Sequence, residues 1–518
     1  MLLNPAAPCA PLLEGIQSNA INGSRLHVIN LKIFIGSPLY HQGPMQYNDA
    51  VDRLTIRPAH WCALLVTVAA ATYAGAFHGT FQYDDLSTIL INPHLDRWET
   101  FVGHLDHMVR PLLYATFLLD RSLYGTSATG YHLLNLLLHL GSGLVVYRIL
   151  THAVTEETRQ VPFWTALLFL IHPIQTETVT YISGRASALM AFFYLLALLL
   201  YIEAAVRRHA GFPHLLYVFG AIFSFVLALG SKETAMTFPL ALLLWDVAIR
   251  RLDGAALRKA FLSDHLPFWL VLLAVAAWAW WHPRYTALAQ FSFGIRPLWE
   301  NILSELHAVT YVLLLFICPW KQNFDHDLPL LHSLFEWPLP LDLLVWCGLA
   351  AAALLAVRRL PLLSFGIGWF FVQLLPTSLI PRNDLLSERN LYLAAMGFLL
   401  VVVLLGSDLT RRLVTALRHP RLVQTGAGTI AFALVFCLCV FTNQRNALYR
   451  DPVLLWSDSI EKSPLKARPH NNLGHGYLLR NDRDRAIEEF RIAAQLDPDY
   501  VLARRNLRDA YLHQVGRQ

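Results

Sequence analysis

Long apolar segments recur along most of the chain, with short polar connections between them. A helix needs about 20 apolar residues to cross the roughly 30 Å hydrocarbon core of a bilayer, and continuous runs of this kind exclude the alternating pattern of a closed barrel. The pattern therefore predicts an all-α, polytopic helical membrane protein. The expected spans, about eleven, are 60–77, 131–150, 162–172, 186–206, 213–230, 234–249, 265–282, 339–357, 361–379, 391–408 and 425–442.

One further segment, 299–318, is apolar enough to cross the membrane as well. Cytoplasmic connections carry an excess of Lys and Arg, and eleven crossings with a cytoplasmic N-terminus place most of the basic connections inside. A twelfth crossing would move the basic pair Arg358 and Arg359 outside. We therefore interpret 299–318 as an interfacial or partly inserted helix on the outer face, with the C-terminus outside.

The composition agrees with a protein that lies largely in lipid. Hydrophobic residues make up 55% of the chain, charged residues only 15%, and the mean hydropathy is +0.42, so a water-facing surface could not be covered. The six cysteines fall mostly in apolar segments and indicate no disulfide framework. No His or Cys cluster has metal-ligand spacing, so we expect no metal and no cofactor, although carboxylates alone could recruit a divalent ion.

The two ends of the chain differ from the apolar middle. Residues 1–55 lack both sustained periodicity and a signal-peptide pattern, so we expect a poorly ordered leader, with Met45 as an alternative start, before a membrane domain over 56–442. Residues 443–518 are charged and contain pairs that are separated by the 34-residue TPR period. These pairs are Leu473 with Leu507, Tyr477 with Tyr511, and Pro464 with Pro498. One complete repeat is fewer than independent stability requires, so this tail should pack on the membrane domain, a second copy or a ligand.

Polar residues gather at the predicted outer ends of the spans. Asp84 and Asp85 follow the first span, and repulsion between adjacent carboxylates would raise the pKa of one of them and favour proton acceptance. A solvated pair that ends a helix is the alternative. The other residues at these ends are Arg110, His132, His172, Glu177, Arg185, Lys232, Glu233, Glu388 and Arg389.

Charges are costly inside a bilayer, so their gathering at one face predicts a shared polar cavity at the lipid–water boundary. Snorkelling or structural pairing, as between Glu388 and Arg389, is the competing explanation, and hydrogen bonds between helices would equally explain the stripe of His132, Asn135 and His139. A carboxylate pair beside Arg and Lys suits displacement of a phosphate from a membrane-dissolved donor. Nucleotide-binding glycine motifs are absent from the sequence.

The order of the motifs resembles the transmembrane and TPR-containing O-mannosyltransferase (TMTC) family, of the GT-C class of glycosyltransferases. The motifs are FQYDD, RPLLYATFLLDRSLYG with GYHLLNLLLHL, HPIQTETVTYISGRAS, GSKETAMTFPLALLLWD and SERNLYLAAMGF, followed by the TPR sequence. The resemblance implies inverting transfer of a sugar from a polyprenyl-phosphate-linked donor to a hydroxyl of a protein or glycan outside the membrane. The TPR sequence here is barely more than one unit.

The resemblance also implies roles for the polar residues. Asp84 would be the general base with Asp85 in support, while Arg185, Lys232 and Arg389 would hold the lipid phosphate. The remaining residues would line the cavity: Arg110, His132, His172, Glu177, Glu233 and Glu388. In a bacterial host the active site and the tail would lie on the periplasmic side of the inner membrane.

Two other functions compete with this expectation. A non-enzymatic membrane scaffold would bind a protein partner through its TPR unit and use the polar residues only to join helices. A transporter or flippase would place its polar residues at the membrane midplane, which the one-sided clustering opposes. No nucleic-acid partner is expected.

Overall fold

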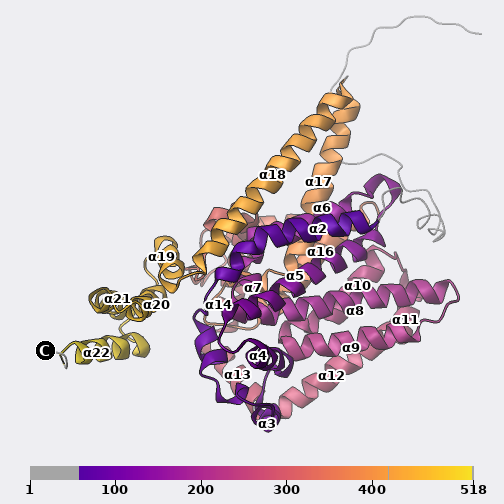
Figure 1. Ribbon diagram of the computed structural model, residues 1–518. Coiled ribbons are helices and arrows are strands. Elements are labelled where there is room, and N and C mark those ends of the chain that lie inside the picture. Colours follow the sequence, from indigo (N-terminus) through magenta and orange to yellow (C-terminus); the bar gives the residue numbers. More distant parts are fainter. Residues whose placement is uncertain (1–57, 418, 516–518) are drawn as a thin grey trace, which may run out of the picture. The chain divides into compact units, whose positions relative to one another are not determined.

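The computed structural model describes residues 58–417 and 419–515, which form helices and contain no strand (Figure 1). The predicted leader 1–55 lies outside the described residues. Nine of the described helical segments are long and apolar enough to cross a membrane, which confirms an all-α, multi-pass membrane protein. They are α2 with η1 (Ala59–His78), α5 (Ala128–Thr151), η7 with α8 (Ile182–His209), α11 to α12 (Gly254–Trp281), α14 (Leu298–Ile317), α15 (Leu339–Ala356), α16 (Pro361–Leu379), α17 (Ala394–Ala416) and α18 (Pro420–Leu448).

Shorter helices connect or complete these segments. α9 (Leu215–Ser231) is apolar but shorter than the nine. The remaining elements before the tail are η2 (Leu86–Leu90), η3 (Pro93–Leu95), α3 (Trp98–Val102), η4 (Leu105–His107), α4 (Pro111–Tyr124), η5 (Glu156–Thr158), α6 (Val161–Ile171), η6 (Pro173–Gln175), α7 (Thr176–Val179), η8 (Glu233–Thr237), α10 (Phe238–Ala248), η9 (Phe261–His265), α13 (Pro283–Ile295), η10 (Pro319–Lys321) and η11 (Glu388–Asn390).

Two predicted spans form half-length helices. α6 and α10 have 11 residues each, and at about 1.5 Å per residue each covers only about half of the hydrocarbon core. Irregular turns replace the missing half, and residues 172–182 after α6 are all buried. Non-helical backbone at membrane depth is tolerated only inside protein or beside a cavity. The short helices therefore carry polar motifs into the interior of the bundle.

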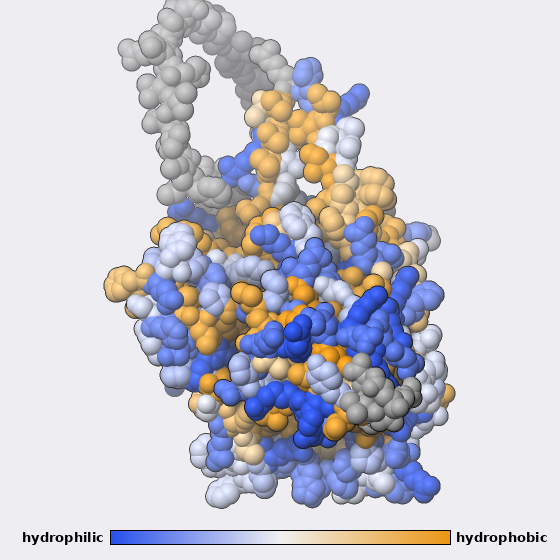
Figure 2. All heavy atoms as spheres, turned by 90° about the vertical axis from the view of Figure 1, so that its left-hand side faces the viewer, coloured by the Kyte–Doolittle hydropathy of each residue, from blue (hydrophilic) through white to orange (hydrophobic). Residues whose placement is uncertain are grey.

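The two ends of the bundle differ in their chemistry. One end, where α2, α16 and α18 finish and α5, α8 and α17 begin, carries the polar motifs, and we call it the site end. Its edge has a set of largely exposed tryptophans typical of a membrane interface: Trp278, Trp280, Trp281, Trp299, Trp320 and Trp337. The opposite end has partly exposed arginines that pair with largely buried carboxylates: Arg148 with Glu203, Arg208 with Asp264, and Arg250 with Asp246. Viewed from the side of the tail, hydrophilic residues cover much of the surface, while the protruding upper part is largely hydrophobic (Figure 2).

α14 lies against the site end, although its length and composition would allow it to cross. α12 finishes at the site end and α15 begins there, so the chain between them leaves and re-enters the bundle at the same end. The contacts of α14 follow an oblique line across the ends of α16, α15 and α17. They join Asn301 to the Ser378 carbonyl (2.9 Å), His307 to Asp342 (3.0 Å) and the rings of Phe316 and Phe398 (4.4 Å between centroids). An interfacial position for 299–318 stays a prediction.

Close approach of α16 and α17 depends on glycine. A methyl group at Gly397 of α17 would collide with the carbonyl of Gly366 and the amide of Phe370 on α16. We predict that Gly397→Ala pushes the helices apart and lowers the free energy of unfolding by about 1–3 kcal/mol, because overpacking strains a close-packed core. Thermal unfolding in detergent checks this expectation. Gly406→Ala, on the same helix with no heavy atom near its added Cβ, should change stability little.

The tail consists of four helices, α19 (Pro452–Lys462), α20 (Ala467–Leu479), α21 (Arg483–Leu496) and α22 (Val501–Val515). Successive helices pack on one another, and Gly474 of α20 lets Phe490 of α21 approach closely. Helix hairpins of this kind fit the TPR interpretation. The tail and the membrane helices fall within one compact unit, residues 48–518, so the tail packs on the membrane domain. α18 continues to Leu448, beyond the predicted end of the membrane domain at 442.

Candidate functional site

Asp84 and Arg389 meet at the site end although they stand in distant motifs. The Asp84 carboxylate is 42% exposed, and its Oδ2 lies 3.9 Å from Nη1 of Arg389. The same guanidinium nitrogen lies 3.7 Å from Oε1 of Glu177. The backbone N–H of Asp84 donates to the hydroxyl of Tyr181, 3.1 Å away, and Arg389 lies over the Tyr181 ring. An open carboxylate is therefore held beside a cation.

Asp85 occupies a different environment from its neighbour. It is fully buried and accepts hydrogen bonds from the backbone N–H groups of Gln82 and Ser183, both at 2.8 Å, and from the Ser183 hydroxyl at 2.5 Å. Burial raises the pKa of Asp85 to about 7, against the opposing effect of these bonds, and repulsion by Asp84 contributes less than burial does. Asp85 thus fastens the turn that contains Tyr83, Asp84 and Asp85, which we call the acidic turn, to η7. The Asp84 carboxylate, in contrast, is partly exposed to solvent.

Stability should depend on pH through Asp85. A carboxyl whose pKa is raised in the folded state binds its proton more tightly there than in the unfolded chain, so stability falls as pH rises from about 4 to about 7. We expect Asp85→Asn to remove this contribution, so the stability difference between the variant and the wild type should change between pH 5 and pH 8 in favour of the variant. Thermal midpoints in detergent across that range check this expectation. A pH-independent difference would contradict it.

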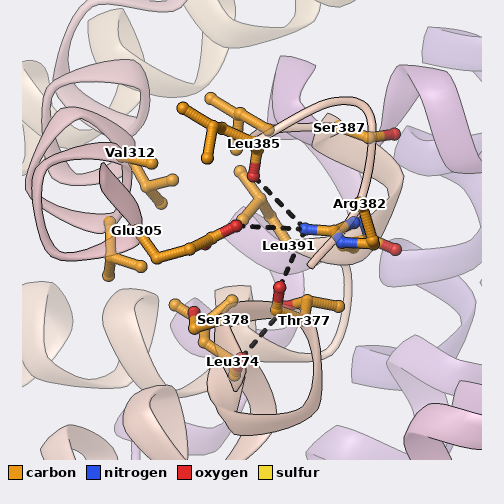
Figure 3. Close-up of a pocket in the computed structure, with 13 residues that line it drawn as sticks. Glu305, Val312, Leu374, Thr377, Ser378, Arg382, Leu385, Ser387 and Leu391 are labelled. Carbon is orange, nitrogen blue, oxygen red and sulfur yellow. Dashed lines mark hydrogen bonds and ion pairs between the residues drawn. The ribbon is translucent and has the colours of Figure 1, made fainter. Parts of the chain in front are cut away.

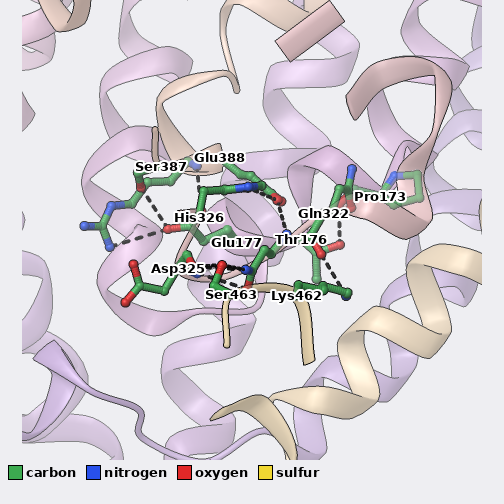
Figure 4. Close-up of polar contacts among 12 residues, drawn as sticks. Pro173, Thr176, Glu177, Gln322, Asp325, His326, Ser387, Glu388, Lys462 and Ser463 are labelled. Carbon is green, nitrogen blue, oxygen red and sulfur yellow. Dashed lines mark hydrogen bonds and ion pairs between the residues drawn. The ribbon is translucent and has the colours of Figure 1, made fainter. Parts of the chain in front are cut away.

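Glu177 joins the buried segment after α6 to the loop before α17 (Figure 4). Its Oε1 accepts from the Ser387 hydroxyl and its Oε2 from the Arg389 backbone N–H, both at 3.0 Å. Glu177 therefore fixes both the backbone and the side chain of Arg389.

Glu388 is the centre of a second buried set of contacts (Figure 4). Its carboxylate accepts from the Asn323 backbone N–H at 2.7 Å, from Nε2 of His326 at 2.9 Å and from Arg445 at 3.0 Å. Burial alone would raise the pKa of Glu388, but Arg445 and His326 outweigh it and lower the pKa. Glu388 thus contacts the loop 319–338 and the end of α18. It anchors the segment that carries Arg389.

Basic side chains gather beside Arg389. The ammonium of Lys232 donates to Ser187 Oγ and Asn390 Oδ1, both neutral partners at 2.7 Å. Burial lowers the pKa of Lys232, and the nearby guanidinium groups of Arg110 and Arg389 lower it further. Arg110 itself forms a two-bond pair with Glu233, at 2.8 and 3.1 Å. Lys232 therefore has neutral hydrogen-bond partners and lies near two guanidinium groups.

A small pocket, with room for about one water molecule, adjoins the basic cluster (Figure 3). Arg382 lies in its wall, donates to the carbonyls of Thr377 and Leu385 at 3.1 and 3.2 Å, and lies 3.8 Å from Glu305. Asn390, the partner of Lys232, also lines it. The sequence reasoning missed Arg382, although its position in the polar segment 381–390, together with Arg389, was a usable signal.

Arg185 is not open to this region. It is fully buried and pairs with Asp120 at 2.5 Å, donates to Asn135 at 2.7 Å and to the Tyr131 carbonyl at 2.8 Å, and lies over the Phe117 ring. These contacts join α4, α5 and α8. In this arrangement Arg185 meets its hydrogen-bonding needs inside the protein and acts as a link between helices.

The two predicted histidines are also buried. His172 uses both ring nitrogens on backbone, with Nε2 at 3.0 Å from the Phe316 carbonyl and Nδ1 accepting from the Ile174 N–H, so it joins α6 to α14. His132 lies against Gly79, and neither of its nitrogens has a hydrogen-bond partner among the described residues. Among the same residues, no group of three or more His, Cys, Asp or Glu has a metal-binding arrangement.

A protein O-mannosyl-transferase of Caenorhabditis elegans is 25% identical over 84% of this chain and 63% of its own length. Human protein O-mannosyl-transferase TMTC4 is 26% identical over 85% of this chain and 67% of its own length, and human TMTC1 is 25% identical over 87% and 57%. The chain thus spans about two thirds of these relatives or less. No protein-family model matches, and no solved structure gives a significant match. The comparisons confirm the resemblance found in the motifs: over most of its length this membrane protein is similar to the TMTC proteins.

Proposed function

We propose that this chain is a glycosyltransferase that moves a mannosyl residue from a polyprenyl-phosphate-linked donor to a hydroxyl of an acceptor protein. The observation that carries the proposal is the open carboxylate of Asp84 beside Arg389, next to the basic side chains of Lys232 and Arg110. The names of the relatives, which are protein O-mannosyl-transferases, support the sugar and the protein acceptor.

The geometry suggests a single displacement with inversion. Asp84 accepts the proton of the acceptor hydroxyl, and the resulting oxygen attacks the anomeric carbon from the face opposite the phosphate. The bond between that carbon and the phosphate oxygen breaks, and polyprenyl phosphate leaves with the bonding electrons. Arg389 and Lys232 stabilise the charge that develops on the phosphate, with Arg110 and Arg382 nearby. The proton ends on Asp84, so no redox partner is required.

The position of the site fits a donor that is dissolved in the membrane. The exposed tryptophans around the site end mark the depth at which lipid headgroups lie, so a phosphate at that depth could reach the basic cluster while its polyprenyl chain stays in lipid. We assign the end with the arginine pairs to the cytoplasm. The site end and the tail then face the periplasm of a bacterial inner membrane.

Reconstitution tests the donor directly. Purified protein in liposomes should transfer radiolabel from polyprenyl-phosphate mannose to an acceptor protein, and it should not use a mannose nucleotide, because the chain has no nucleotide-binding glycine motif. Transfer from the nucleotide but not from the lipid would overturn the proposed donor. Absence of transfer from both would overturn the enzyme itself.

Arg389 should be needed for efficient transfer. We expect Arg389→Gln to lower kcat/KM for the lipid donor about 100-fold to 1,000-fold, because a positioned donor that stabilises developing charge has an effect of that order. Arg389→Lys should recover only part of the loss, since an ammonium cannot reproduce a planar guanidinium that lies between Glu177 and Asp84. Arg284→Gln, an exposed arginine on α13, is the matched control and should behave as wild type. Equal rates for Arg389→Gln and the control would rule out this role.

A further inference from the structure

The tail makes close contacts with the two loops that carry the proposed active site. The first loop, 319–338, contains Asn323 and His326, the partners of Glu388. The second, 380–393, carries Arg389 and ends at α17. Helix α20 of the tail contacts both loops, while α19 contacts the first loop and the turn that contains Tyr83 and Asp84.

An aromatic cluster joins the tail to the acidic turn. Tyr83 precedes Asp84 and has a φ of 44°, a left-handed conformation that a bulky side chain rarely adopts without support from its surroundings. Its ring packs edge-on against Trp456 of α19, with 5.6 Å between centroids, and against Phe324 at 6.4 Å. Phe324 in turn contacts Tyr181, whose hydroxyl accepts from the Asp84 backbone. The tail thus supplies support for the strained residue next to Asp84.

An ionic cluster joins the tail to the loop of Arg389. Arg468 of α20 donates to Asp325 at 2.6 Å and to Asp384 at 2.6 Å, and Lys466 pairs with the same carboxylates at 2.6 and 3.2 Å. Asp325 is only 2% exposed, so these charges interact with little screening by solvent. Asp384 stands in the segment that leads to Glu388. The cluster therefore holds loops 319–338 and 380–393 against each other.

We propose that the C-terminal helical unit, residues 452–515, completes the active site by holding the Asp84 turn and the Arg389 loop in register. This inference rests on the proposed function for its catalytic consequence, but the positioning itself can be measured independently. Trp456, Arg468 and Lys466 act as positioning residues, since they touch neither Asp84 nor Arg389 directly.

Hydrogen–deuterium exchange of the full-length protein in detergent tests the positioning. In Arg468→Ala and in Trp456→Ala, backbone amides of 80–86 and 384–390 should exchange about tenfold faster or more, while α5 and α8 stay protected as in wild type. Asp384→Asn removes part of the same ionic cluster from the membrane side and should give the same change in 384–390 without altering the tail sequence. Arg491→Ala removes an equal charge from an exposed pair on α21 and is the control. Unchanged exchange in 80–86 and 384–390 would overturn the inference, whatever the activity.

Transfer kinetics test the catalytic consequence. Arg468→Ala and Trp456→Ala should lower kcat about tenfold or more, because misplacement of reacting groups by about 1 Å is costly. Trp456→Phe should restore most of the rate, since it keeps an aromatic ring against Tyr83, and Arg491→Ala should stay within about twofold of wild type. Faster exchange together with an unchanged kcat would overturn the proposal that the tail completes the active site. If the wild-type protein itself transferred no mannose, the proposed function would be overturned. The exchange experiment would then remain as the test of positioning.

Discussion

Asp84→Asn should lower the rate of mannosyl transfer by about 100-fold to 10,000-fold, the range that a positioned general base contributes. The amide cannot accept the proton of the acceptor hydroxyl, yet it has nearly the same shape as the carboxylate. Because Asp84 is 42% exposed and its nearest cation is 3.9 Å away, the substitution should change the thermal midpoint little. Single-turnover transfer from labelled polyprenyl-phosphate mannose is the measurement.

Two further variants make this result specific. Asp84→Glu keeps a carboxylate but moves it, so transfer should be reduced less than in Asp84→Asn. Asp106→Asn removes an exposed carboxylate from η4 at the same end of the bundle and should leave transfer unchanged. If Asp84→Asn transferred at the wild-type rate, the assignment of the base would be wrong and a non-enzymatic role would gain support.

The second large effect should be a loss of stability. Glu388→Ala leaves Arg445 with an uncompensated charge in a buried position, and removal of one partner from a buried ion pair costs about 3–5 kcal/mol. It also deprives the Asn323 amide and His326 of their acceptor. We therefore expect a much lower thermal midpoint in detergent, and loss of transfer because the adjacent Arg389 is no longer held.

Glu388→Gln separates charge from hydrogen bonding. The amide oxygen can still accept from the Asn323 N–H, so this variant should be less destabilised than Glu388→Ala. Glu99→Ala, on the exposed helix α3, is the control for loss of a carboxylate and should unfold as wild type does. Near-normal stability of Glu388→Ala would show that the carboxylate is not the anchor of the loop.

Most of the fold could be predicted from the sequence because its physical signal is local. Apolar segments of sufficient length indicate spans by themselves, and the two arginines at 358–359 were enough to favour an interfacial position for 299–318. Half-length helices were harder to predict. The segment 162–172 was predicted as a short span that continues into its polar flank. α6 (Val161–Ile171) has nearly these bounds, but the flank continues as buried turns, because the stabilising contacts come from distant helices.

The candidate site could be predicted only in part. The types and approximate locations of Asp84, Glu177 and Arg389 follow from their places at the ends of spans, and the structure brings these three together. Accessibility could not be read from the sequence. In the sequence Arg185 and Arg389 occupy similar positions at the ends of spans. In the structure Arg185 is buried in an ion pair with Asp120 of α4. Partners such as Asn323 and Arg445 stand in segments without a recognisable pattern.

The buried polar segment 172–182 also constrains how the protein is made. A half-length helix that is followed by Gln175, Glu177 and Thr180 would leave carbonyls and a carboxylate in the acyl chains if the insertion machinery released it alone. This segment therefore has to enter the membrane together with α5 and α8, which pack against it. Variants in which these segments no longer insert together should be degraded by quality-control proteases before any loss of transfer could be observed.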